Sequence, residues 1–162
     1  MIHHEIVEAN GLRFHCARAG EGPLMLFLHG FPEYWAMWQP MLEHFGARGW
    51  CAVAPDLRGY NRSDKPAAVE DYRPKHLMAD VLALAAHYTK DKFVLVAHDW
   101  GGAVAMALVG TIGGGTGLLG VSGGGTGPCG SSAGAGCARG AAGAQQVSQP
   151  PQQARERHGQ LQ

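Results

Sequence analysis

Three short apolar runs place the strongest constraint on the fold of this chain. Residues 23–28 read P-L-M-L-F-L, residues 51–54 read C-A-V-A, and residues 93–97 read F-V-L-V-A. None of them alternates apolar with polar residues, and such continuous runs are typical of strands that are buried on both faces. Strands of this kind belong to sheets that carry helices on each side. The sequence therefore predicts an α/β fold with a mostly parallel sheet.

The segments between and after these runs show the spacing of helices. Residues 34–48 carry apolar side chains three and four positions apart, and Gly49 follows where a C-terminal cap would lie. Residues 76–88 repeat the pattern after Pro74, a residue typical of the first helical turn. Residues 103–109 would begin one more helix. Strands that alternate with helices in this way indicate a sheet covered on both faces.

The chain begins with a different element. Residues 3–7 and 12–19 are strand-like, and Asn10-Gly11 between them is the strongest short signal for a hairpin. We therefore expect two antiparallel strands before the first of the buried strands.

Each apolar run ends in a turn that is unusually polar or rich in glycine. The turns are 29–32 (H-G-F-P), 56–60 (D-L-R-G-Y) and 98–102 (H-D-W-G-G). Functional residues gather at the carboxyl ends of the strands in a doubly wound sheet. These turns are therefore the candidate functional site.

The three turns lie within motifs that resemble those of the α/β-hydrolase superfamily, in its epoxide hydrolase and dehalogenase branch. The motifs are H-G-F-P-E at 29–33, D-L-R-G-Y-N-R-S-D at 56–64 and A-H-D-W-G-G at 97–102. Relatives often have Gly at the position of Asn61, but Asn tolerates positive φ better than most residues. The resemblance runs from about residue 5 to residue 109. It implies the N-terminal part of an α/β-hydrolase core over residues 1–110.

The resemblance implies that Asp99 is a catalytic nucleophile. Ala97, Asp99 and Gly101 fit a nucleophile elbow, in which small residues let a strand and a helix approach closely around a strained turn. A carboxylate suits attack on an sp³ carbon because the ester that it forms can then be hydrolysed by water. The backbone N–H groups of Phe31 and Trp100 would stabilise the oxyanion of the second step.

Other motif residues are expected to support this site rather than to react. The supporting residues are His29, Gly30, Pro32, Gly101 and Gly102. The resemblance also implies a cis Phe31–Pro32 bond. Asp56 and Arg58 are expected to brace their loop. His98 lies beside Asp99, but neighbours in an extended chain point to opposite sides, so a structural role is favoured over that of a base.

The implied substrate is a small hydrophobic epoxide or halide, and no cofactor or metal is expected. Phe31 favours the epoxide hydrolases, because haloalkane dehalogenases usually have a halide-binding Asn at this position. Fluoroacetate dehalogenases share the motif set but tend to have Arg where this chain has Trp100. Epoxide hydrolase is therefore the first choice, and a haloalkane or fluoroacetate dehalogenase is the alternative.

The composition changes near Val109. Every Trp, Tyr and Phe precedes this point, whereas residues 111–162 are rich in Gly, Ala and Gln. Glycine loses the most backbone entropy on ordering, and few apolar side chains are present there to offset that loss. No stable structure is expected from about Gly113. The outer edge of the strand at 93–97 is accordingly expected to be open.

The family also needs an acid and a histidine after the nucleophile, together with a helical cap that supplies two tyrosines. After Asp99 the acid is Glu156 and the histidine is His158, and neither has the context of a strand. The sequence thus predicts an incomplete and inactive hydrolase, arising from a shifted reading frame or a join to unrelated sequence. A non-enzymatic interaction module is the remaining alternative, although the tail has no aromatic residue or basic cluster that would bind a partner.

Charge and hydropathy narrow the classes of partner. The formal net charge is zero and no Lys/Arg run occurs, so neither nucleic acid nor an anionic membrane surface is expected. No basic leader precedes an apolar segment, and no run reaches about 18 apolar residues, so a cytoplasmic location is expected. The cysteines lack the spacing of metal ligands and are expected to be plain thiols; they are Cys16, Cys51, Cys129 and Cys137.

Overall fold

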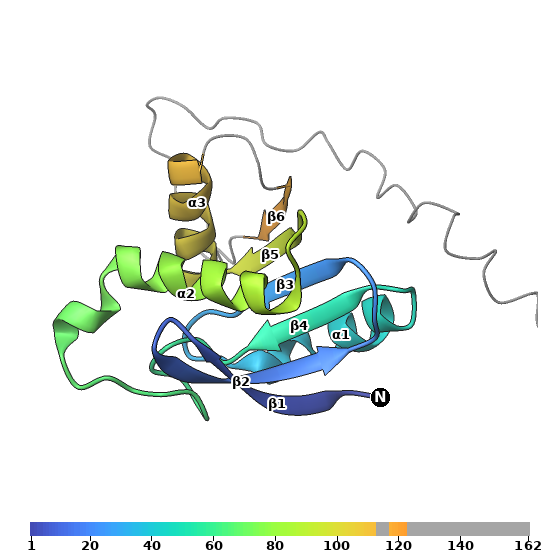
Figure 1. Cartoon of the computed structure of the whole chain (residues 1–162), viewed down its shortest axis with the longest axis horizontal. Coiled ribbons are helices and arrows are strands. Elements are labelled where there is room, and N and C mark those ends of the chain that lie inside the picture. The colour runs from blue at the N-terminus through green and yellow to red at the C-terminus, as the bar shows by residue number, and fades with distance from the viewer. Residues whose placement is uncertain (113–116, 123–162) are drawn as a thin grey trace, which may run out of the picture. The chain divides into compact units, whose positions relative to one another are not determined.

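The computed structural model describes residues 1–112 and 117–122 (Figure 1). The strands are β1 (His3–Ala9), β2 (Leu12–Ala19), β3 (Leu24–Leu28), β4 (Cys51–Pro55), β5 (Val94–His98) and β6 (Gly117–Ser122). The helices are α1 (Gln39–Gly46), α2 (Pro74–Tyr88) and α3 (Trp100–Ile112). Two 3₁₀ turns, Trp35–Trp38 and Val69–Tyr72, precede α1 and α2.

The strands form one mixed sheet in the order β1-β2-β4-β3-β5-β6. β1 and β2 are antiparallel, as are β2 and β4, whereas β4, β3, β5 and β6 run parallel. The predicted α/β fold with a mostly parallel sheet is confirmed. The hairpin between β1 and β2 turns at Asn10 and Gly11, whose φ angles of 47° and 75° are those of a two-residue type I′ turn.

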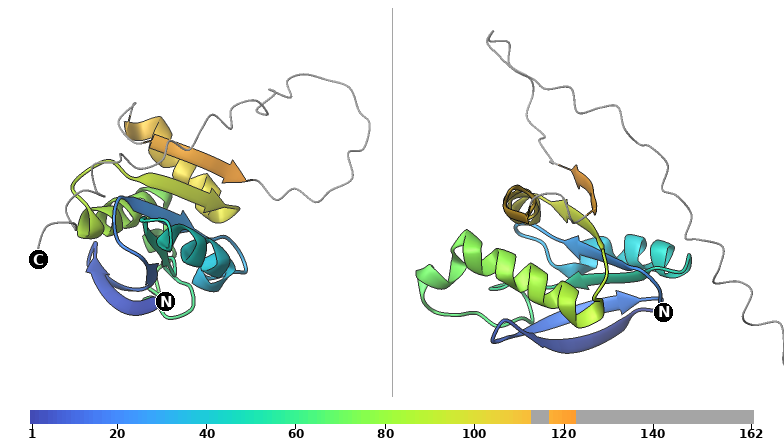
Figure 2. Two further views of the ribbon diagram at one scale, coloured as in Figure 1. Left: turned by 90° about the vertical axis from the view of Figure 1, so that its right-hand side faces the viewer. Right: turned by 45° about the horizontal axis from the view of Figure 1, so that its top comes forward.

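The two faces of β3 enter separate cores, which explains its unbroken apolar sequence. Leu24, Leu26 and Leu28 pack in the core under α2 and α3. Met25 and Phe27 pack on the opposite face, in the core that α1 covers. All five side chains are at most 5% exposed. Figure 2 shows α1 and α2 on opposite faces of the sheet, so every position of β3 must be apolar.

The helix expected over residues 34–48 is shorter than predicted. The chain forms a 3₁₀ turn over Trp35–Trp38 and only then the α-helix α1. Pro40 lies in the first turn of α1, and a proline ring clashes with the carbonyl four residues earlier, so an α-helix cannot pass through it from residue 34. α1 ends at Gly46, and Gly49 takes a φ of 81° in the turn toward β4.

β6 lies beside β5, at the edge that the sequence predicted to be open. It runs parallel to β5, with Val94 opposite Gly117 and Leu95 opposite Leu118. The unpaired N–H and C=O groups along an edge strand can bond to any extended segment within reach, and residues 117–122 supply one. The expected lack of stable structure in the tail from about Gly113 stays a prediction. Residues 113–116 and 123–162 lie outside the described residues.

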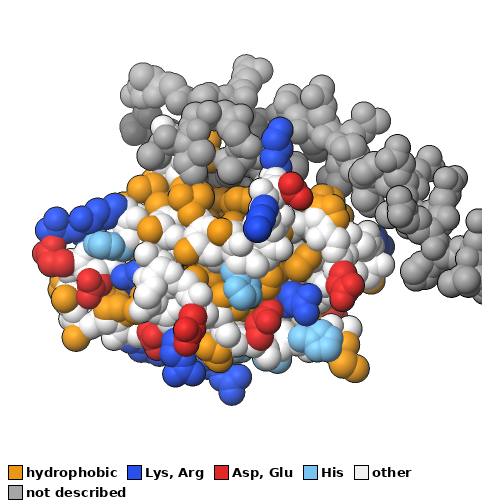
Figure 3. All heavy atoms as spheres, viewed as in Figure 1, with side chains coloured by type: hydrophobic (Ala, Val, Ile, Leu, Met, Phe, Trp, Pro, Cys, Tyr) orange, Lys and Arg blue, Asp and Glu red, His pale blue; other side chains and the backbone are white. Residues whose placement is uncertain are grey.

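The surface of the described part carries both signs of charge. Figure 3 shows acidic and basic side chains interspersed over the visible face. No helix within residues 1–112 and 117–122 is long and apolar enough to cross a membrane.

Candidate active site

Asp99 occupies a sharp turn between β5 and α3. Its φ is 51°, a left-handed conformation that few residues other than glycine adopt. The helix after it starts close to β3, and the Gly101 N–H donates a 3.1 Å hydrogen bond to the carbonyl of His29. A Cβ on Gly101 would lie 2.6 Å from the carbonyl oxygens of Leu28 and His29. Glycine is therefore required for this approach of helix to strand.

Backbone N–H groups bind the Asp99 carboxylate. The N–H of Phe31 donates to Oδ1 over 2.8 Å. That bond and a second one from the Trp100 N–H lower the pKa of Asp99 below its ordinary value, because they stabilise the charged form. The carboxylate is therefore ionised at neutral pH and has a defined orientation.

Gly30 leaves the space that Asp99 occupies. A Cβ on Gly30 would lie 2.4 Å from Cβ of Asp99 and 2.5 Å from Oδ1, which is closer than real side chains approach. The Glu33 N–H closes the loop by donating to the Gly30 carbonyl over 3.0 Å. The Phe31–Pro32 bond in this loop is cis, as the resemblance implies. The loop after β3 and the turn after β5 thus fit against each other with no side chain between them.

His29 connects the loops that follow β3 and β4. Its Nε2 accepts the Leu57 N–H over 2.9 Å, which leaves Nδ1 to donate to the Gly30 carbonyl over 3.0 Å. Burial lowers the pKa of His29, so the ring is neutral when it makes these bonds. The ring also packs against Tyr60 in an edge contact at 4.8 Å between centroids. Both nitrogens are engaged, so His29 has none free for proton transfer.

Asp56 holds the loop after β4 in place through hydrogen bonds to its carboxylate. Its Oδ2 lies 2.7 Å from Nδ1 of His15 and accepts a 2.9 Å hydrogen bond from the Asn61 amide. Its Oδ1 accepts the Trp35 N–H over 3.1 Å. Asn61 has a φ of 39°, a positive value that Asn tolerates better than most residues.

Arg58 joins the same loop to α2 through a buried ion pair. Its Nε and Nη2 donate to the two oxygens of Asp80, each over 2.7 Å. The Asn10 amide also donates to Asp80 over 2.7 Å, and Nη1 of Arg58 donates to the Asp71 carbonyl over 2.8 Å. The bonds to Asp80 raise the pKa of Arg58. The pair therefore braces the loop, as the sequence predicted for Arg58.

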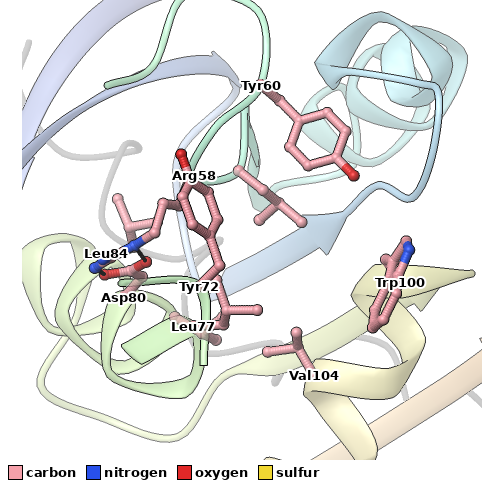
Figure 4. A pocket seen from close by; sticks show the side chains of 10 residues that line it. Arg58, Tyr60, Tyr72, Leu77, Asp80, Leu84, Trp100 and Val104 are labelled. Carbon is pink, nitrogen blue, oxygen red and sulfur yellow. Dashed lines mark hydrogen bonds and ion pairs between the residues drawn. The ribbon is translucent and has the colours of Figure 1, made fainter. Parts of the chain in front are cut away.

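A cavity of about 220 Å³ opens beside Trp100, the neighbour of Asp99 (Figure 4). Its lining residues are Leu57, Arg58, Tyr60, Tyr72, Leu77, Asp80, Val81, Leu84, Trp100 and Val104. The two charged members bind each other, and the hydroxyl of Tyr72 donates to the Pro66 carbonyl over 2.9 Å. The hydroxyl of Tyr60 points toward Trp100 across the cavity. The cavity is therefore mostly apolar, with one hydroxyl on its wall near Trp100.

The chain matches the sequence model of one protein family over more than half of its length. Residues 23–112, more than half of the chain, match the model described as the alpha/beta hydrolase fold. The chain belongs to the α/β-hydrolase fold family. The matched residues include β3, β4, β5 and the turn that carries Asp99.

This α/β-hydrolase is similar to proteins about three times as long as the matched segment. It is 43% identical over 109 residues to the AB hydrolase superfamily protein YfhM of Bacillus subtilis (strain 168), which covers 66% of this chain and 38% of the relative. It is 40% identical over 104 residues to epoxide hydrolase 3 of Siraitia grosvenorii, with coverage of 64% and 33%. The crystal structure of epoxide hydrolase VrEH1 from Vigna radiata matches with a TM-score of 0.67 and 44% identity, over 68% of this chain and 35% of that one. The chain is epoxide hydrolase-like by homology and spans about a third of these relatives.

The structure of this α/β-hydrolase brings most of the predicted site residues together. Phe31 and Trp100 meet at Asp99, Gly30 packs against it, and Gly102 lies in the first turn of α3. His98, by contrast, lies near Glu33, with 3.6 Å between its Nδ1 and Oε2 of Glu33. Within the described residues, no histidine ring hydrogen-bonds to the Asp99 carboxylate, and no group of three or more His, Cys, Asp or Glu could hold a metal. Glu156 and His158 lie outside the described residues.

Sequence reasoning did not single out three residues that the structure adds to this α/β-hydrolase site. They are Tyr60, Tyr72 and Asp80. Tyr60 lies inside the motif at 56–64, which was a signal that could have found it. The other two come from the segment before α2 and from α2 itself, and nothing in their local sequence marks them.

Proposed function

We propose that Asp99 is the nucleophile of an epoxide hydrolase-like reaction on a small hydrophobic epoxide. The observation that supports this most is the carboxylate at the sharp turn after β5, bound by the backbone N–H of Phe31. Such a strand–turn–helix exposes a nucleophile at the carboxyl end of its strand. Several proteins to which the chain is similar are epoxide hydrolases by name.

In the first step, the carboxylate oxygen that Phe31 leaves unbound attacks a ring carbon of the epoxide. A carbon–oxygen ester bond forms, the ring carbon–oxygen bond breaks, and the ring oxygen takes up a proton from water or from a neighbouring side-chain hydroxyl. The lowered pKa of Asp99 keeps its carboxylate ionised for this attack. The bond from Phe31 restricts rotation of the carboxylate, so that its other oxygen keeps one direction.

In the second step, water attacks the carbonyl carbon of the ester, the bond from that carbon to the substrate oxygen breaks, and the diol leaves as the Asp99 carboxylate is restored. The carbonyl oxygen of that ester is Oδ1, which already accepts the Phe31 N–H, so the developing oxyanion meets a donor in place. A base must take the proton of the water, and such a base contributes about 10²- to 10⁴-fold. No histidine within the described residues is bonded at Asp99. We therefore propose that this chain forms the ester but hydrolyses it slowly.

The cavity beside Trp100 supports a substrate with one apolar substituent. Its volume is about 220 Å³ and its lining is mostly apolar. A dry cavity of about 150 Å³ accommodates a benzene ring in another protein, so a single aryl group suits this one. The binding of the aryl group there would hold the epoxide next to Asp99.

The test is the mass of the full chain after incubation with styrene oxide. We expect one covalent adduct that peptide mapping places on Asp99, and no adduct at this position in Asp99→Ala. Alanine is less favourable than aspartate at the φ of 51°, so circular dichroism checks that the variant stays folded. Diol is assayed in parallel, and less than one equivalent per chain is expected. Absence of an adduct on Asp99 would overturn the proposal that Asp99 is the nucleophile. Formation of diol over many turnovers that depends on Asp99 would overturn the proposal that the ester is hydrolysed slowly.

A further inference from the structure

We infer that Tyr60 donates the proton to the ring oxygen when Asp99 opens the epoxide. The inference rests on the proposed function, because it assigns a further catalytic residue to the same reaction. It arises from the position of one hydroxyl in the wall of the cavity beside Trp100 (Figure 4).

The ring of Tyr60 is held in place by the framework of the site. The Tyr60 N–H donates to the Leu57 carbonyl over 2.9 Å, and the Tyr60 carbonyl accepts the Ser63 N–H over 3.0 Å. The ring lies edge-on against His29, which is itself buried and bonded at both nitrogens. Tyr60 is thus positioned by the same histidine that supports the loop next to Asp99.

The hydroxyl of Tyr60 is available to a ligand. The hydroxyls of Tyr72 and Tyr88 are occupied, the first by the Pro66 carbonyl at 2.9 Å and the second by Glu5 at 3.0 Å. That of Tyr60 has no hydrogen-bond partner within the part of the chain that the structure describes. It points across the cavity toward Trp100, whose backbone N–H binds the Asp99 carboxylate. A substrate seated between Tyr60 and Trp100 would therefore meet the hydroxyl and the nucleophile together.

The electrostatics keep this hydroxyl protonated. Burial and the nearby negative charge of Asp99 both raise the pKa of Tyr60 above its ordinary value. The hydroxyl therefore carries its proton at neutral pH. An alkoxide is a stronger base than a tyrosinate, so the proton moves once the ring opens: the O–H bond of Tyr60 breaks, an O–H bond forms on the former ring oxygen, and water returns a proton to the tyrosinate.

The experiment compares two reagents that carry the same aryl group but have different leaving groups. Styrene oxide must gain a proton at its leaving oxygen, whereas (2-bromoethyl)benzene releases bromide, which needs none. The rate of ester formation on Asp99 is measured by mass spectrometry for the full chain, Tyr60→Phe and Tyr72→Phe. Tyr72→Phe is the matched control, since it removes a hydroxyl from the same cavity wall that is already bonded to Pro66.

We expect Tyr60→Phe to slow the epoxide reaction by at least about tenfold and to change the bromide reaction by less than about twofold. Tyr72→Phe should leave the ratio of the two rates unchanged. An unchanged epoxide rate in Tyr60→Phe, or an equal loss with both reagents, would overturn the role of Tyr60 and leave Asp99 as the nucleophile. A wild-type chain that forms no Asp99 ester with either reagent would overturn the proposed function itself.

Discussion

The backbone N–H of Phe31 donates a 2.8 Å hydrogen bond to Oδ1 of Asp99, although 68 positions separate the two residues. Their loops follow β3 and β5, which lie side by side with Leu28 opposite Ala97. The geometry at Asp99 therefore depends on the register of two strands. A substitution that forces the two loops apart should weaken the site without touching the carboxylate.

Gly30→Ala is expected to have this effect. The new Cβ would lie 2.4 Å from Cβ of Asp99, so the turn or the loop must move. A displacement of about 1 Å at a reacting group can cost about 100-fold in rate, and we expect Asp99 ester formation to fall by at least about tenfold. Gly110→Ala is the control, because no atom of the described residues lies within 4 Å of its Cβ position in α3. It should keep the rate and stabilise the helix by about 0.5–1 kcal/mol; equal rates in both variants would contradict the prediction.

Asp80→Ala should strongly destabilise the chain. The variant leaves the Arg58 guanidinium, whose side chain is 6% exposed, without its partner. Removal of one member of a buried ion pair typically costs about 3–5 kcal/mol, so we expect the free energy of unfolding to fall by this amount when it is measured by urea unfolding. The matched control is Glu70→Ala, which breaks a pair with Arg73 in which the side chains are 67% and 61% exposed. The free energy of unfolding of this control should fall by less than about 1 kcal/mol. Similar losses in the two variants would refute the buried role of Asp80.

The ester-forming rate should be insensitive to acid until the pH is low. Attack requires the Asp99 carboxylate, and its pKa in the folded chain lies below the ordinary 3.8. A lowered pKa keeps the group ionised as the pH falls through that value, so the rate should hold from neutral pH to about pH 4 and decline only below it. Circular dichroism at each pH checks that the chain stays folded. A decline with a midpoint above the ordinary pKa would show that the N–H bonds do not stabilise the carboxylate.

The two buried cysteines should resist alkylation in the folded chain. Cys16 is 0% exposed and Cys51 is 9% exposed. Burial raises the pKa of Cys16 to about 12 and that of Cys51 above 9.0, so little thiolate is present at mildly alkaline pH. Iodoacetamide should therefore leave the peptides that contain them unmodified, and concentrated urea should restore labelling. Rapid labelling of Cys16 without denaturant would contradict its place in the core.

The strands and the main turns could be predicted because their signals are local. β3 is apolar at every position, since both of its faces are covered, and Asn10-Gly11 has the backbone freedom of a tight hairpin. The position of Asp99 after an apolar strand and before Gly101 marked the turn as well. Such features depend on neighbours in the chain, so the order of residues is enough to determine them.

Only the tertiary structure decided which distant groups meet. The pairing of β6 with β5, the bidentate bond of Arg58 to Asp80, and the cavity shared by Tyr60 and Trp100 each join segments that are separate in the sequence. No local pattern encodes them, because a strand edge, a buried charge or a free hydroxyl acquires its partner only when the sheet and its helices have packed. The sequence by itself determined the strands and the turn that carries Asp99, whereas packing determined what surrounds that residue.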